Sequence, residues 1–294
     1  MSLLRAASQD AAVALSEAPV VPEGAAMFLL GLGLILAASG LVAVPLVGGW
    51  FKHKLPREQV FFARWGFTHV VVIVLAWFLG AAVVGGLMGK EWIVTDSFLI
   101  ELALGSLPFL VAAGFVGYYA NKLHPERLHA LGWRFDERTF LSMVMAWFSY
   151  FLVLPAIFGV GLLWMWAAPY LGIDYEQQDV LKNAMKLQGG ERIVGLLVMA
   201  GLIPLLEEWL FRGFLQPLLI QNLRELGGIA MTSFCFAILH GPSAFAPVFC
   251  LSVFLGFIQL RSHRLPAAWL VHATHNASML LLIWLAPETV EILG

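Results

Sequence analysis

The sequence predicts an all-α, polytopic membrane protein, and composition is the first reason. Of the 294 residues, 60% are hydrophobic and 12% are charged, whereas about a quarter of a typical soluble domain is charged. A soluble fold of this length could not bury so much apolar surface. The second reason is that the apolar residues gather in about eight stretches, most of them near the roughly 20 residues that one membrane crossing requires. We therefore expect a bundle of about eight transmembrane helices in a multi-pass protein of the inner or plasma membrane.

The predicted membrane helices follow one another with short polar connections. They cover residues 25–51, 65–89, 97–120, 139–168, 193–220, 228–239, 244–260 and 266–286. The first stretch is longer than a signal-peptide core and no basic region directly precedes it, so we interpret it as a retained helix. Between the fourth and fifth stretches, residues 176–187 fit either a short amphipathic helix on the outer face or a solvated loop.

These stretches divide the chain into three regions. Residues 1–24 form a polar N-terminal tail, residues 25–190 a four-helix transmembrane region, and residues 191–290 a C-terminal transmembrane core. The formal net charge of −2 gives no basic excess for nucleic acid, so no nucleic-acid partner is predicted. Cys235 and Cys250 lie in apolar runs and have neither disulfide nor zinc spacing, which indicates packing residues.

Lysine and arginine residues predict the orientation in the membrane, because cytoplasmic loops are enriched in them. The connections after the first, third, fifth and seventh stretches hold Lys52, Lys54, Arg57, Arg64, Lys122, Arg127, Arg134, Arg138, Arg224, Arg261 and Arg264. The opposite side holds Arg5, Lys90, Lys182, Lys186 and Arg192. We therefore expect both termini to face away from the cytoplasm.

Ionisable side chains inside a bilayer cost several kcal/mol and therefore indicate function. Glu208 and Arg212 are four residues apart, so they share one helix face and can pair. Glu207 points about 100° away from Glu208, which leaves one carboxylate without this partner. We interpret the unpaired acid as a candidate general base for a water molecule.

Two further polar groups occur on neighbouring predicted helices. His240 ends the sixth stretch, and His272 and Asn276 lie four residues apart on the eighth. A histidine can help to hold a water molecule, while a second histidine and an asparagine amide can donate hydrogen bonds to an oxyanion. These parts suffice for hydrolysis of a peptide bond. The alternative is a zinc-activated water, with Glu207, His240 and His272 as the ligands.

These motifs resemble those of the CAAX-protease and bacteriocin-processing family (CPBP, or Abi), which includes the type II CAAX prenyl endopeptidases. The family pattern is Glu-Glu-x-x-x-Arg, then Phe-x-x-x-His, then His-x-x-x-Asn or Asp. All seven positions have a counterpart in the same order: Glu207, Glu208, Arg212, Phe236, His240, His272 and Asn276. The resemblance covers residues 193–286.

The resemblance implies an intramembrane endopeptidase that cleaves membrane-associated or lipidated protein substrates. It implies that Glu207 and His240 activate water and that His272 and Asn276 form the oxyanion site. Glu208 and Arg212 would support these residues, as would Phe236. We favour a mechanism without a metal cofactor, since asparagine is an uncommon zinc ligand, and keep zinc as the alternative. The expected partners are membrane lipids and the substrate.

Two other functions are compatible with buried polar residues in a membrane. A proton-coupled transporter also uses intramembrane glutamate, arginine and histidine, although the sequence lacks the repeated halves typical of such transporters. A catalytically inactive scaffold could bind membrane partners through the same cavity. Formation of a cleaved product distinguishes the protease from both.

Overall fold

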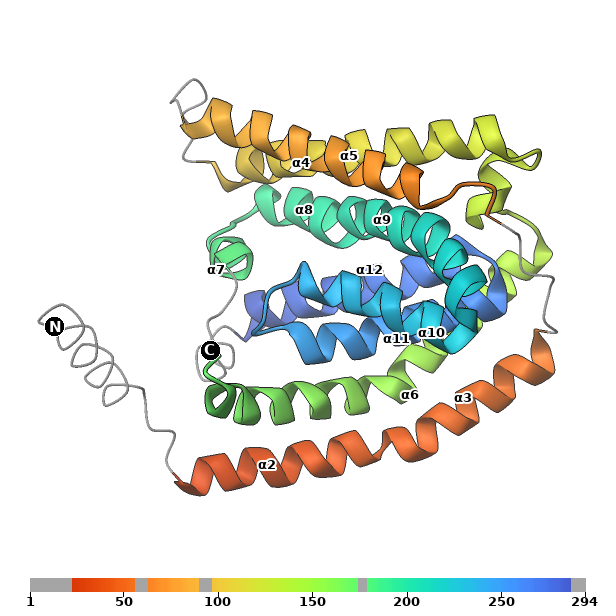
Figure 1. The fold of residues 1–294 in the computed structure, drawn as a ribbon. Helices are drawn as coiled ribbons and strands as arrows, with labels where there is room; N and C mark the ends of the chain where they lie inside the picture. Colours follow the sequence, from red (N-terminus) through yellow and green to blue (C-terminus); the bar gives the residue numbers. More distant parts are fainter. Residues whose placement is uncertain (1–22, 56–62, 90–96, 174–178, 287–294) are drawn as a thin grey trace, which may run out of the picture.

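The computed structural model describes residues 23–55, 63–89, 97–173 and 179–286, and Figure 1 shows their arrangement. Within these ranges all regular secondary structure is helical, which confirms the predicted all-α fold class. The predicted polar tail, residues 1–24, lies outside the described residues except for its last two positions. Arg5, Arg57 and Lys90 of the charge argument also lie outside them.

The helices follow one another as α2 (Glu23–Ala38), α3 (Gly40–Lys54), α4 (Phe67–Gly89), α5 (Phe98–Leu123), η1 (Arg127–Leu131), α6 (Glu137–Ala167), η2 (Ala168–Leu171), α7 (Asp179–Met185), α8 (Gly190–Leu196), η3 (Leu197–Leu202), α9 (Ile203–Glu208), η4 (Trp209–Leu215), α10 (Gln216–Ile238), α11 (Phe245–Ser262) and α12 (Leu265–Leu285). The segments η1 and η2 are 3₁₀ turns, whereas η3 and η4 are π-helical.

The described residues contain seven helices that are long and apolar enough to cross a membrane, one fewer than the eight expected. The difference arises because the fifth and sixth predicted stretches belong to one helical run, Gly190–Ile238. This run changes direction at Arg224, whose backbone leaves the helical region with φ 62° and ψ 178°. In Figure 1 the limb after the bend doubles back beside the first limb. The sixth stretch is therefore the returning limb of a hairpin, and it runs back along the bundle as a separate pass would, joined to the fifth stretch by continuous helix.

The segment from α8 to α12 lies at the centre of the bundle (Figure 1). The pair α4 and α5 lies on one side of it, and α2, α3 and α6 lie on the other. Helix α2 approaches α6 closely at Gly159, where any Cβ atom would clash with the backbone of Ala37. Small residues are typical of such contacts, because membrane helices associate through close packing of their surfaces. The N-terminal helices therefore frame the segment that carries the predicted motifs.

A buried cluster joins α6 to α11 and α12 through residues that include Tyr150, Leu255 and Val271. On the other side of the centre, Phe214 and Leu218 pack with residues of α4 and α5. Many apolar side chains on the outer helices stay exposed, as expected for surfaces that face lipid. The two clusters hold the central segment between both groups of outer helices.

The predicted arrangement of the loops agrees with the topology in Figure 1. The start of α2 and the end of α12 lie on one side of the bundle, and the ends of α3 and α5, the bend before the returning limb and the α11–α12 turn lie on the other. The latter segments carry most of the basic residues that predict a cytoplasmic face. That this face is the cytoplasmic one stays a prediction.

The segment 176–187 contains a short helix, as one of the two alternatives predicted. Helix α7 covers Asp179–Met185, and the remaining residues 176–178 lie outside the described part of the chain. Its Ala184 carbonyl accepts a hydrogen bond from the Trp284 indole at 2.9 Å, so that α7 is held against the end of α12.

A charged clamp connects two loops on the basic side of the bundle. Arg264 is buried, and its guanidinium donates to both oxygens of Asp136 at 2.6 and 3.1 Å. Asp136 also caps the N-terminus of α6, accepting from the Thr139 backbone N–H at 3.0 Å. The hydrogen bonds from Arg264 lower the pKa of Asp136 to about 2. The clamp fixes the start of α6 to the start of α12.

Removing the charge of Asp136 is expected to destabilise the fold in a pH-dependent way. The folded-state pKa lies below the ordinary value of about 4, so the clamp stabilises fully above about pH 4 and loses this contribution as the pH falls through about 2. Asp136→Asn keeps an N-capping oxygen but loses the ion pair. Its unfolding free energy at pH 7 is expected to fall by about 1 kcal/mol, because the half-exposed carboxylate is partly screened.

The measurement is thermal or denaturant unfolding in detergent at pH 7 and across pH 4 to 2. The difference between wild type and Asp136→Asn should narrow as the pH falls through this window. Equal stability of the two proteins at pH 7 would contradict the assignment.

Candidate active site

The two adjacent glutamates lie on α9, a short α-helical segment between the π-helical segments η3 and η4. Both carboxylates are buried: Glu207 is 8% exposed and Glu208 is 0% exposed. π-Helical turns inside longer helices occur frequently at functional sites, because they change the faces that successive side chains present. The local backbone therefore sets the directions of Glu207 and Glu208 within an apolar bundle.

Pro204 explains how this helical run connects to α12. In η3 the N–H of Ile203 donates to the carbonyl of Val198, five residues earlier. Pro204 has no N–H, so it cannot make the equivalent bond to the carbonyl of Met199. That carbonyl instead accepts a hydrogen bond from Nδ2 of Asn276 at 3.0 Å. The missing backbone donor is thereby replaced by a side chain of the predicted site.

Glu208 and Arg212 form the ion pair that their spacing predicts. Nη1 of Arg212 lies 3.1 Å from Oε1 of Glu208, and both side chains are fully buried. Nη2 of Arg212 donates to the hydroxyl of Ser252 on α11 at 2.7 Å and to its carbonyl at 3.2 Å. Arg212 therefore joins α9 and η4 to α11 in the interior of the bundle.

His272 connects the two glutamates. Its Nδ1 lies 2.9 Å from Oε1 of Glu208, which requires the proton on Nδ1 because a carboxylate only accepts. Its Nε2 points toward Glu207, with 3.7 Å to Oε2. The imidazole is 2% exposed. Glu208 thus fixes the ring so that its other nitrogen faces the second carboxylate.

His240 approaches Glu207 from the end of α10. Its Nδ1 lies 2.8 Å from the carbonyl of Phe236, so this nitrogen carries the proton when the ring is neutral. Its Nε2 lies 4.0 Å from Oε1 of Glu207, and about a quarter of the side chain is exposed. The carboxylate of Glu207 thus lies between the Nε2 atoms of two imidazoles. Both distances exceed a direct hydrogen bond and are compatible with a bridging water.

Phe236 packs at the centre of these polar side chains. Its ring lies 4.6 Å from the guanidinium of Arg212, a cation–π contact. The ring centroids of His240 and His272 are 4.5 and 5.7 Å from that of Phe236. Phe236 therefore separates the ion pair from His240 and restricts both imidazoles.

The structure brings six of the seven motif residues into one cluster of direct neighbours: Glu207, Glu208, Arg212, Phe236, His240 and His272. Asn276 lies one helical turn after His272, and its contact to Met199 uses one amide hydrogen. An amide nitrogen carries two hydrogens, so a second remains for a ligand. His275 lies about 60° around α12 from His272, where its Nδ1 lies 3.1 Å from the hydroxyl of Tyr150 on α6.

Sequence reasoning missed two supporting residues. Ser252 binds Arg212, but a lone serine in an apolar run gives no signal. Gln216 follows Glu208 and Arg212 at intervals of four residues, and its amide donates to the Gly256 carbonyl at 3.0 Å. This four-residue repeat of polar side chains could have identified Gln216 as part of the same helix face.

The donor chemistry of Glu207, His240 and His272 suits zinc. Among the described residues, no group of three histidine, cysteine, aspartate or glutamate side chains is placed to hold a metal ion. The choice between a metal-free and a zinc-dependent mechanism stays a prediction.

Comparison with known proteins gives one family match. Residues 189–278 match the model for "Type II CAAX prenyl endopeptidase Rce1-like". No significant match was found among curated proteins or solved structures. The matched segment contains all seven motif residues and runs from the turn before α8 into α12.

This match and the seven apolar helices identify a multi-pass integral membrane protein and support, in general terms, an intramembrane protease of the CAAX type. The segment 189–278 is Rce1-like, which confirms the family resemblance drawn from its motifs.

Proposed function

We propose that this protein is an intramembrane endopeptidase that uses Glu207 to activate water. The observation that carries the proposal is the position of the Glu207 carboxylate, buried between the Nε2 atoms of His240 and His272 at 4.0 and 3.7 Å. A water molecule in this space would have one carboxylate and two imidazoles as partners. A positioned carboxylate of this kind can act as a general base.

In the first step, Glu207 takes a proton from the water while the water oxygen attacks the carbonyl carbon of the scissile peptide bond. His240 holds its proton on Nδ1 toward Phe236, so its neutral Nε2 can accept from the same water and orient it. The carbonyl oxygen becomes an oxyanion. The surrounding helices exclude bulk water, which strengthens each of these polar interactions.

His272 and Asn276 are the proposed donors to the oxyanion. Because Nδ1 of His272 faces Glu208, the ring can donate to the oxyanion only from Nε2, when that nitrogen also carries a proton. In the second step Glu207 returns its proton to the leaving nitrogen and the carbon–nitrogen bond breaks, which releases a carboxylic acid and an amine. The acid then gives its remaining proton to the amine, so that the products are a carboxylate and an ammonium group.

The proposed substrates are membrane-associated or lipidated proteins. His240 is the most exposed member of the cluster, so a peptide would approach from its side, whereas Glu207, Glu208 and Arg212 are reached only through the bundle. The resemblance to prenyl endopeptidases adds cleavage after a lipidated cysteine as the first substrate to test. No observed contact favours a transporter or a scaffold over a hydrolase.

The central experiment is Glu207→Gln in purified protein reconstituted in lipid vesicles. Two peptides ending in Cys-aliphatic-aliphatic-X, one farnesylated and one not, serve as substrates, and mass spectrometry detects the released tripeptide. We expect cleavage by the wild type and a loss of a hundredfold or more in Glu207→Gln, since general-base catalysis contributes about 10²–10⁴.

If neither peptide is cleaved, the membrane proteomes of cells that express wild type or Glu207→Gln are compared for new protein termini. Cleavage that persists in a folded Glu207→Gln protein would refute the role of Glu207. Transport of a solute without any cleaved product would favour the transporter.

Glu208→Gln tests whether the neighbouring glutamate has a different role. This change leaves the buried Arg212 without its ionic partner, and breaking such a pair costs about 3–5 kcal/mol. Glu207→Gln is the matched control, because Glu207 makes no comparably short contact. We expect a large fall in thermal stability for Glu208→Gln and little change for Glu207→Gln, measured by melting in detergent. Equal losses of thermal stability in the two variants would contradict the assignment of Glu208 to the ion pair and of Glu207 to general-base catalysis.

A chelator separates the two ways of activating water. Activity is expected to survive prolonged dialysis against 1,10-phenanthroline, because Glu207 and His240 can activate water without a metal. Complete loss that is restored by added zinc would overturn the metal-free mechanism while leaving the proteolytic function intact. The inactive chelator isomer 1,7-phenanthroline controls for nonspecific inhibition.

A further inference from the structure

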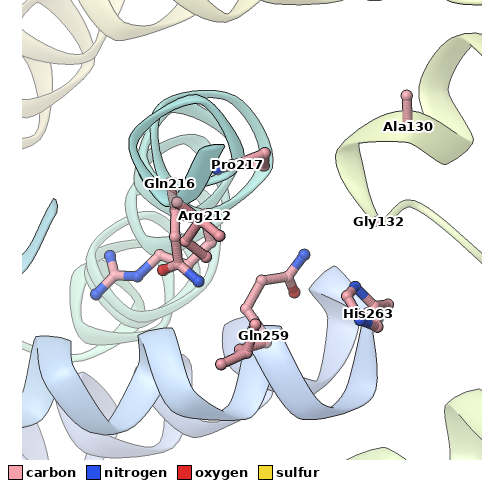
Figure 2. A pocket seen from close by; sticks show the side chains of 9 residues that line it. Ala130, Gly132, Arg212, Gln216, Pro217, Gln259 and His263 are labelled. Carbon is pink, nitrogen blue, oxygen red and sulfur yellow. The ribbon is translucent and has the colours of Figure 1, made fainter. Parts of the chain in front are cut away.

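A small pocket of about 30 Å³ lies behind the ion pair, toward the basic side of the bundle. Its walls come from the start of α10, the end of α11 and the loop after η1. Figure 2 shows that Gln216 and Gln259 extend from facing helices toward the space between them, with Arg212 beside Gln216 and Gly132 at the loop. None of these glutamine or glycine residues belongs to the family motifs.

Two polar stripes face one another at this pocket. Glu208, Arg212 and Gln216 follow at four-residue intervals along one helix, and Ser252, Gly256 and Gln259 follow along α11. The stripes are joined by hydrogen bonds from Arg212 to Ser252 and from Gln216 to Gly256. The pocket lies beyond the second of these bonds, so it continues the polar face that begins at the candidate active site.

Nη1 of Arg212 faces Glu208 in the ion pair. Three other buried polar atoms on the two facing helices have no hydrogen-bond partner among the described residues. They are Nε of Arg212, Oε1 of Gln216 and Oε1 of Gln259. The three side chains are 0%, 2% and 7% exposed. Buried polar atoms without partners are rare and costly, and in apolar surroundings the cost is highest. These atoms therefore require a ligand that offers an acceptor to Arg212 and donors to the two glutamine oxygens.

We propose that this pocket is a binding site for one or two water molecules. Water both donates and accepts, and a buried water makes about three hydrogen bonds, so one or two waters can serve the three atoms named above. The volume also agrees, since a single water needs at least about 10–15 Å³ measured in this way. An anion fits less well, because Nε2 of Gln216 donates to Gly256 and so leaves an oxygen, not a donor, for the pocket.

The bound water supports the site through Arg212. One edge of the guanidinium contacts Glu208 and Ser252, while Nε requires the pocket water. Glu208 in turn holds Nδ1 of His272 at 2.9 Å. The hydrated pocket is thus the outer end of a polar chain that fixes the ring of His272. This consequence for catalysis rests on the proposed function, whereas the water site itself does not.

The first test asks whether Gln259→Met raises or lowers the melting temperature of the protein. Gln259→Met replaces the amide by an apolar group of similar size. In a dry pocket this would remove an unpartnered acceptor and leave stability equal or higher. With bound water it removes a partner of that water, and the melting temperature in detergent should fall by several degrees. Gln221→Met, on the same helix as Gln216 but outside the pocket walls, is the matched control. It loses only a long hydrogen bond of 3.5 Å to the Ala63 carbonyl, so its melting temperature should fall less than that of Gln259→Met.

The second test is a double-mutant cycle with Gln216→Met, which separates loss of a shared water from two independent packing defects. If the same water binds both glutamines, the double variant loses clearly less stability than the sum of the single variants. Additive losses, or an unchanged or higher melting temperature for Gln259→Met, would overturn the proposal. All readings are melting temperatures, so they hold even if the protein is not a protease.

Titration with inorganic phosphate and chloride tests the remaining ligand class. We expect that neither anion produces a saturable rise in the melting temperature of the wild type through this site. A rise through this site would be seen in the wild type and would be absent in Gln259→Met. Such a rise would replace water by an anion at this site. An experimental structure that resolves solvent should show density within about 2.7–3.2 Å of these polar atoms.

Discussion

The buried ion pair between Glu208 and Arg212 is the interaction on which the candidate site depends. Two opposite charges with no solvent exposure are stable in a bundle only when their remaining hydrogen-bonding groups also find partners. Ser252 on α11, Phe236 on α10 and His272 on α12 supply part of these contacts, whereas Nε of Arg212 has no hydrogen-bond partner among the described residues. The need to satisfy one pair therefore brings three further helices to the same place. Glu207 lies next to this assembly without being neutralised by it.

The buried backbone groups of this segment must also find hydrogen-bond partners. Inside a membrane each unsatisfied polar group costs several kcal/mol, so irregular backbone persists only where protein side chains repair it. At Pro204 the repair comes from Asn276, and at Gly201 the carbonyl accepts from the indole of Trp269 at 2.9 Å. Both repairing residues belong to α12. The π-helical segment η3 and the helix that carries His272 are therefore fixed to each other by the irregularity itself.

The helices outside the Rce1-like segment contribute support at defined points. Tyr150 on α6 is buried and contacts His275, so α6 holds α12 from a face that adjoins the candidate site. On the other side, the Trp65 indole donates to the Phe214 carbonyl at 2.9 Å, next to η4. The N-terminal half thus carries none of the motif residues, but it contacts both helices on which the motif residues lie.

The sequence by itself determined the fold class, the membrane location and the pairing of Glu208 with Arg212, because these follow from composition and from the 3.6-residue period of one helix. It also indicated the polar residues of α10 and α12, since charged or hydrogen-bonding groups in apolar stretches are conspicuous. The break between the fifth and sixth stretches was also predicted from the polar residues around Arg224. Only the tertiary structure decided that this break is a sharp bend within continuous helix and not a loop. The separation of the two imidazoles from Glu207, the repair of Met199 by Asn276 and the facing stripes of α10 and α11 likewise depend on how helices pack against one another. A single-helix period contains no information about these contacts between helices.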